Sequence, residues 1–66
     1  RLTSREIEIL KLLSSGYTYA GIAEKTFVSL NTVKYHMKNI YGKLNISGRN
    51  QAIIKAKELG IRPDLS

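Results

Sequence analysis

The sequence contains no cysteine and no tryptophan, and it has one proline and one histidine. Without cysteine the chain forms neither a disulfide scaffold nor a zinc finger, and it has no thiol nucleophile. A single histidine, His36, does not make a metal site, and with scattered serines it assembles no nucleophile and base. No apolar run approaches the roughly 18 to 20 residues of a membrane span, and no signal-peptide pattern opens the chain. We therefore expect no catalytic residue, no metal, no cofactor and no insertion into a membrane.

The length of the chain, 66 residues, fits one small domain, residues 1–66, with a thin hydrophobic core. Such a core leaves little room for an enzyme cleft of the usual ~300 to 1,000 Å³. Because the chain begins with Arg1 and not with Met, we expect it to be a fragment of a longer protein.

Positive charge is in clear excess and is unevenly distributed. Eleven Lys and Arg residues against five Asp and Glu residues give a net charge of +6, and the isoelectric point is near 9.9. The net charge is +1 over residues 1–33 and +5 over residues 34–66. A basic domain of this kind favours polyanions, with nucleic acid as the first candidate and an acidic membrane surface as the second.

Apolar periodicity and capping residues predict an all-α, compact four-helix domain. The expected helices span about residues 4–15, 19–26, 30–44 and 48–59. The expected N-cap residues are Thr3, Thr18, Ser29 and Ser47. For the first helix, Thr3 and Glu6 form a capping box, and Gly16 is a typical C-terminal stop.

The apolar residues of these helices are expected to share one core. The inward residues predicted for the last three helices are Ile22, Ala23, Val33, Met37, Ile40, Leu44, Ala52, Ile53, Ala56 and Leu59. The aromatic residues Tyr17, Phe27 and Tyr41 are expected to pack against this core.

One side of the expected third helix is polar, because its apolar residues gather on the other side at roughly 100° per residue. The residues of the polar side are Asn31, Tyr35, Lys38 and Gly42, with Lys34 at its border and a second polar edge of Thr32, His36 and Lys43. Amide, phenol and ammonium groups contact base edges and phosphates in a major groove. With a short capped helix before it, this helix predicts a helix-turn-helix unit.

Over about residues 2–61 the sequence resembles the LuxR-type helix-turn-helix domain of bacterial transcription regulators. The matching positions are residues 2–6, 9–13, 16, 22–23, 29, 32–34, 36, 39–40, 43–44, 49 and 51–52. The order and spacing of the whole series make the resemblance specific. The sequence departs from the family at Tyr19, Ala20 and Gly21, where Asn, Lys and an acidic residue are usual.

The resemblance implies a role for each of three sets of residues. It implies base contacts from Lys34, Tyr35 and Lys38, phosphate contacts from Asn31, Thr32, His36 and Lys43, and a dimer face of Asn50, Ile54 and Lys57. It also implies a cytoplasmic, nucleoid-associated regulator that binds inverted half-sites of double-stranded DNA as a homodimer. RNA polymerase is a further candidate partner.

Other interpretations of the same residues remain open at this point. A sigma-factor-like module or helical adaptor would act mainly through protein contacts. Lys34 and Lys38 could be ordinary solvated lysines, Tyr35 could cover the helix surface, and His36 could be a packing residue at the edge of the core. A steep salt dependence of duplex binding would distinguish the DNA-binding domain from a pure adaptor.

Overall fold

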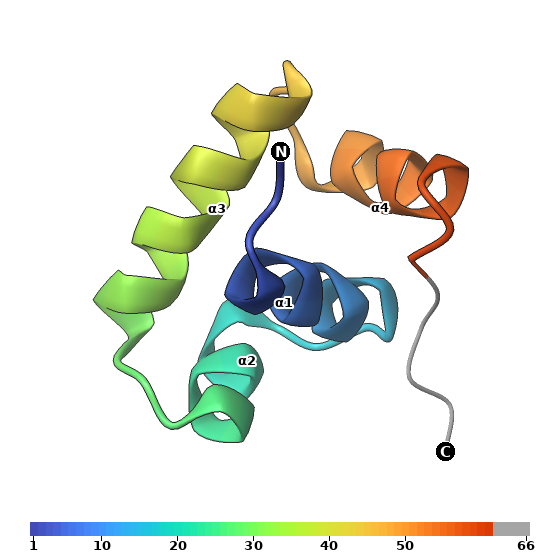
Figure 1. Ribbon diagram of the computed structural model, residues 1–66. Coiled ribbons are helices and arrows are strands. Elements are labelled where there is room, and N and C mark those ends of the chain that lie inside the picture. Colours follow the sequence, from blue (N-terminus) through green and yellow to red (C-terminus); the bar gives the residue numbers. More distant parts are fainter. Residues whose placement is uncertain (62–66) are drawn as a thin grey trace.

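The computed structural model describes residues 1–61, and all regular secondary structure within that range is helical (Figure 1). The four helices are α1 (Ser4–Ser14), α2 (Tyr19–Thr26), α3 (Leu30–Leu44) and α4 (Arg49–Glu58). The all-α helix-turn-helix fold expected from the sequence is confirmed. Helices α2 and α3 have the expected bounds, whereas α1 ends one residue early and α4 is one residue shorter at each end.

Helix α1 lies at the centre of the packing, and α3 likewise contacts the other three helices. Helix α1 contacts α2, α3 and α4, and Figure 1 shows it in the middle of the domain. Ile9, Leu10 and Leu13 of α1 are fully buried. The core is completed by Ile22 and Ala23 from α2, by Val33, Met37 and Ile40 from α3, and by Ala52 and Ala56 from α4. The apolar side of α3 therefore faces the core and its polar side faces solvent.

The first three helices begin at the predicted N-cap residues. At the start of α1, the Glu6 N–H donates to Thr3 Oγ1 at 3.1 Å. The Thr3 N–H in turn donates to Glu6 Oε1 at 2.8 Å, which completes the capping box. The hydroxyl groups of Thr18 and Ser29 accept the corresponding backbone N–H groups of α2 and α3. Local sequence thus determines where these helices start.

The prediction that Ser47 caps α4 is wrong. The N-cap residue is Gly48, which has no side chain to accept a hydrogen bond. Instead the Ser47 N–H donates to Oε1 of Gln51 at 2.9 Å. A side chain at the third helical position can reach back to the N-terminus of its own helix, so Gln51 stabilises the start of α4 from within.

Two residues predicted to pack against the core lie on the surface. Leu59 is 53 % exposed, because α4 ends at Glu58 and Leu59 is already its C-cap residue. Phe27 is 94 % exposed. It ends α2 in the left-handed conformation, with φ 59° and ψ 41°, and the chain changes direction there. The other packing residues, Tyr17, Tyr41, Leu44 and Ile53, are half-buried and lie against the core.

Glu6 is a buried carboxylate that joins α1 to the far end of α3. Its side chain is 4 % exposed, and its Oε1 accepts a hydrogen bond from Lys43 Nζ at 2.9 Å. Burial alone would raise the pKa of Glu6, but the Lys43 ammonium and the Thr3 N–H outweigh burial and hold the pKa below 4.5. The ionised carboxylate is therefore the form that the fold stabilises.

Because the pKa of Glu6 is lowered by folding, its contribution to stability is present above about pH 4.5 and is lost as the pH falls through the lowered value. We expect Glu6→Gln to lower the free energy of unfolding at pH 7 by about 1 to 3 kcal/mol. The free energies of unfolding of the variant and the wild type should converge as the pH falls below the lowered pKa of Glu6, because the wild-type carboxylate is then protonated. Urea denaturation followed by circular dichroism across this pH range measures both effects.

Glu8→Gln is the matched control, because Glu8 is an exposed carboxylate in the same helix. Its stability should follow that of the wild type at every pH. A constant difference between Glu6→Gln and the wild type down to the lowest pH would contradict the assigned role of the ionised carboxylate.

Candidate nucleic-acid interface

The turn between α2 and α3 is short and is fixed by hydrogen bonds at both ends. After Phe27, the Val28 N–H donates to the Ala23 carbonyl oxygen at 3.1 Å and closes the end of α2. The Thr32 N–H donates to Ser29 Oγ at 3.1 Å and opens α3. Two capped helices joined in this way form the helix-turn-helix unit that the sequence predicts.

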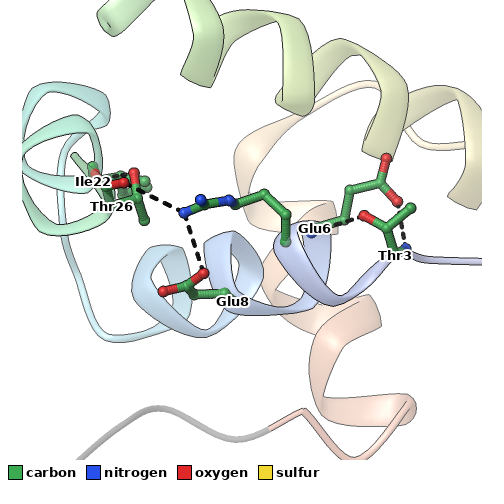
Figure 2. Close-up of polar contacts among 6 residues, drawn as sticks. Thr3, Glu6, Glu8, Ile22 and Thr26 are labelled. Atoms are coloured by element: carbon green, nitrogen blue, oxygen red, sulfur yellow. Dashed lines mark hydrogen bonds and ion pairs between the residues drawn. The ribbon is translucent and has the colours of Figure 1, made fainter. Parts of the chain in front are cut away.

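Arg5 attaches α1 to the C-terminal end of α2, and Figure 2 labels its two partners, Thr26 and Glu8. Its Nη1 donates to the Thr26 carbonyl oxygen at 3.4 Å and lies 3.4 Å from Glu8 Oε1. The buried Thr26 hydroxyl donates to the Ile22 carbonyl oxygen at 2.7 Å. A cation at a helix C-terminus is electrostatically favoured. Sequence reasoning missed this contact, for which the only signal was the position of Arg5 in the family motif.

The polar side of α3 is exposed along the helix. Its exposed residues are Asn31, Lys34, Tyr35, Lys38 and Gly42. A Cβ atom at Gly42 would meet no atom within 4 Å, so packing within the domain does not require glycine there. The ion pairs within residues 1–61 join Arg5 to Glu8, Lys43 to Glu6 and Lys55 to Glu58. Lys34 and Lys38 are outside these pairs, and their ammonium groups lie on one open surface.

The second polar edge of α3 is partly engaged in contacts within the domain. Thr32 is half-buried, and its Oγ1 lies 2.9 Å from Ser29 Oγ. His36 is half-buried. Its ring and the ring of Tyr35 pack edge to face, with the ring centroids 5.7 Å apart. Lys43 donates to Glu6, as described above. This edge therefore combines exposed donors with groups that also stabilise the fold.

The predicted dimer face lies on the exposed side of α4. Asn50, Ile54 and Lys57 are all exposed, Ile54 by 58 %. Ala52 and Ala56 of the same helix are fully buried on its other side. The start of α4 is fixed by Arg49, whose Nη2 donates to the Tyr17 carbonyl oxygen at 2.9 Å. The orientation of this face relative to α1 is therefore determined by the fold.

A pair of tyrosines that the sequence did not predict joins the start of α2 to α3. The hydroxyl oxygens of Tyr19 and Tyr41 lie 3.1 Å apart. Burial and this hydrogen bond raise the pKa of Tyr41 to about 12, against the opposing charge of Arg49. The Tyr41 hydroxyl group is therefore protonated at neutral pH. Tyr19 is one of the positions at which the sequence departs from the family pattern, so the family gave no signal for it.

The described part of the chain has neither a cluster of metal ligands nor a membrane-spanning helix. Within residues 1–61 no three His, Asp or Glu side chains are grouped as they would be to hold a metal ion. None of the helices in that range is both long and apolar enough to cross a membrane.

Comparisons with known proteins agree with this geometry. The family model described as bacterial regulatory proteins, luxR family, matches residues 1–56. The probable transcriptional regulatory protein SgaR of Hyphomicrobium methylovorum is 52 % identical over 52 residues, which are 79 % of this chain and 25 % of SgaR. The transcriptional regulatory protein LiaR of Bacillus subtilis strain 168 is 47 % identical over 55 residues, which are 83 % of this chain and 26 % of LiaR.

A solved structure has the same fold. The transcription factor GerE superposes with a TM-score of 0.84 at 41 % identity, over 92 % of this chain and 91 % of GerE. The chain thus spans about a quarter of the length of SgaR and LiaR and nearly all of the GerE structure. The chain belongs to the luxR family of bacterial regulatory proteins, and it has the helix-turn-helix fold of a DNA-binding output domain.

Proposed function

We propose that this domain binds double-stranded DNA in a sequence-specific manner with α3 in the major groove. The observation that carries the proposal is the division of α3 into a buried apolar side and an exposed side of amide, phenol and ammonium groups. The major groove is about 12 Å wide, and an α-helix with its side chains is about 10 to 12 Å across. Lys34, Tyr35 and Lys38 contact the base edges, where an ammonium group donates to guanine O6 or N7.

Phosphate contacts come from the second polar edge of α3 and from its N-terminal end. The residues assigned to them are Asn31, Thr32, His36 and Lys43. Neutral His36 can donate one hydrogen bond, so this contact does not require an acidic pH. The ammonium of Lys43 has three donors, so it can contact a phosphate while it also holds Glu6.

Two copies pair on DNA through Asn50, Ile54 and Lys57 of α4. Ile54 is the one large apolar residue of that face, and so small a surface falls short of the ~1,000 Å² expected of a stable interface. The free domain is therefore monomeric, and two inverted half-sites raise the effective concentration of one copy for the other.

The regulator acts by occupying DNA, with no covalent step. The net charge of +6 supports attraction to the phosphate backbone and release of its counterions. A bound copy near a promoter is positioned to contact RNA polymerase. Because the bacterial chromosome lies in the cytoplasm, the protein is cytoplasmic and associated with the nucleoid.

Lys38 tests the base contacts, because it lies near the middle of the exposed side of α3. Lys38→Ala should weaken binding to a half-site selected from random duplexes by about 1 to 3 kcal/mol and weaken binding to random duplex far less. Fluorescence anisotropy with both duplexes measures this ratio. Lys11→Ala, which removes an exposed lysine of α1, is the control and should leave the ratio unchanged. An equal loss on both duplexes would mean that Lys38 contacts phosphate only.

Thr32 tests the phosphate contacts. Thr32→Ala should weaken specific and random duplexes by the same factor and leave the preferred sequence unchanged, because phosphates carry no sequence information. Thr32→Ser retains the hydroxyl group and should bind like the wild type. If Thr32→Ala binds both duplexes normally while circular dichroism is unchanged, Thr32 serves only to start α3.

Ile54 tests the dimer face. Ile54→Ser removes the apolar contact without adding a charge that the partner's lysines could attract. Cooperativity on a duplex with two inverted half-sites should fall at least about tenfold, because each buried isoleucine contributes about 1.5 to 3 kcal/mol. Affinity for one half-site and the melting temperature should not change. Leu59→Ser, another exposed apolar residue near the end of α4, is the control. Unchanged cooperativity would exclude Ile54 from the pairing surface.

A further inference from the structure

A helix in the major groove lies between two phosphate strands, and the second polar edge of Thr32, His36 and Lys43 faces only one of them. The groove is about as wide as a helix with its side chains, so both flanks of α3 come close to a strand. Thr32 and His36 lie on one flank. The opposite flank begins at Lys34, on the far side of the base-contacting residues.

Tyr41 lies on that opposite flank. It follows Lys34 by seven residues, so the two side chains leave α3 within about 20° of each other. Tyr41 is half-buried, not enclosed, and lies against the core at the edge of the exposed side. Its hydroxyl group meets that of Tyr19, the first residue of α2, at 3.1 Å. The seam between α2 and α3 therefore ends in two adjacent hydroxyl groups beside the base-contacting surface.

The two hydroxyl groups together carry more donors than their mutual contact uses. Each hydroxyl group has one hydrogen, and the hydrogen bond between them uses one of the two. No second hydrogen bond of either hydroxyl group is described within residues 1–61. Burial and the Tyr19 contact keep Tyr41 protonated by raising its pKa to about 12, although the positive charge of Arg49 opposes this. One O–H donor is left for an acceptor outside the domain, and Arg49 is the positive charge that acts on Tyr41.

We propose that the Tyr19–Tyr41 hydroxyl pair is a phosphate-binding site, which contacts the DNA strand opposite the one contacted by Thr32 and His36. This inference rests on the proposed docking of α3 in the major groove. One hydroxyl group donates to a phosphate oxygen, while the other donates to it within the pair and holds it in position. The site requires tyrosine at position 19 and at position 41 together.

Phenylalanine substitutions test the pair, because they remove the hydroxyl groups and keep the rings that pack. The double variant Tyr19→Phe/Tyr41→Phe should bind specific and random duplexes about tenfold more weakly. Its preferred sequence should not change. The slope of log affinity against log salt should also stay the same, because a neutral hydroxyl group displaces no counterion. Each single variant should show part of the loss.

The control is Tyr17→Phe. Tyr17 is a half-buried tyrosine of the loop between α1 and α2, and removing its hydroxyl group should leave affinity for both duplexes unchanged. Circular dichroism and thermal melting should show that all four variants are folded under the binding conditions. Equal affinity of the double variant and the wild type would overturn the inference.

A methylphosphonate scan separates a direct contact from an effect on helix orientation. Each phosphate of a selected half-site is replaced in turn by a neutral methylphosphonate. At one phosphate, on the strand opposite the one sensitive to Thr32→Ala, replacement should weaken the wild type about tenfold and the double variant much less. If no phosphate distinguishes the two proteins, the pair only orients the helices, and the inference is wrong.

The same measurements separate failure of this inference from failure of the proposed function. If the wild type binds neither duplex, the proposed DNA binding itself is wrong. If the wild type binds and Lys38→Ala has its expected effect, but no phosphate is coupled to the tyrosines, only the phosphate-binding site is wrong.

Discussion

The ionised carboxylate of Glu6 is the interaction on which the arrangement of the helices depends. It caps the first turn of α1 through the Thr3 N–H and holds Lys43 near the end of α3. Arg5, the residue before it, holds the end of α2 through the Thr26 carbonyl oxygen. Two adjacent residues of α1 thus attach the C-terminal ends of both helices of the helix-turn-helix unit. The position of the exposed side of α3 is a consequence of these attachments and of the apolar core behind them.

Most of the fold could be predicted because its information is local. Capping residues such as Thr3, Thr18 and Ser29 act within one helical turn of themselves, and the apolar spacing of Val33, Met37 and Ile40 describes one helix face. For the same reason the exposed side of α3 could be predicted residue by residue. What these exposed residues contact is a property of the complex with DNA, which the sequence of one partner does not contain.

The incorrect or missing predictions have different physical causes. At the start of α4, Gly48 and not Ser47 is the N-cap, and Oε1 of Gln51 accepts the Ser47 N–H from inside the helix. Leu59 fits the apolar spacing of α4 but lies beyond its last helical residue. The contact between Tyr19 and Tyr41 spans 22 residues of sequence, and no periodicity or capping rule relates two positions that far apart.

The central place of α1 has a consequence for how the domain opens. Helices α2, α3 and α4 each bury apolar residues against α1, so none of its fully buried residues can reach water unless a neighbouring helix detaches. Elements that open locally are those with few buried contacts. We therefore expect the backbone amides of the middle of α1 to exchange their hydrogens with solvent through openings in which a neighbouring helix detaches. Because α3 packs against α1, such openings also change the support of the exposed side of α3.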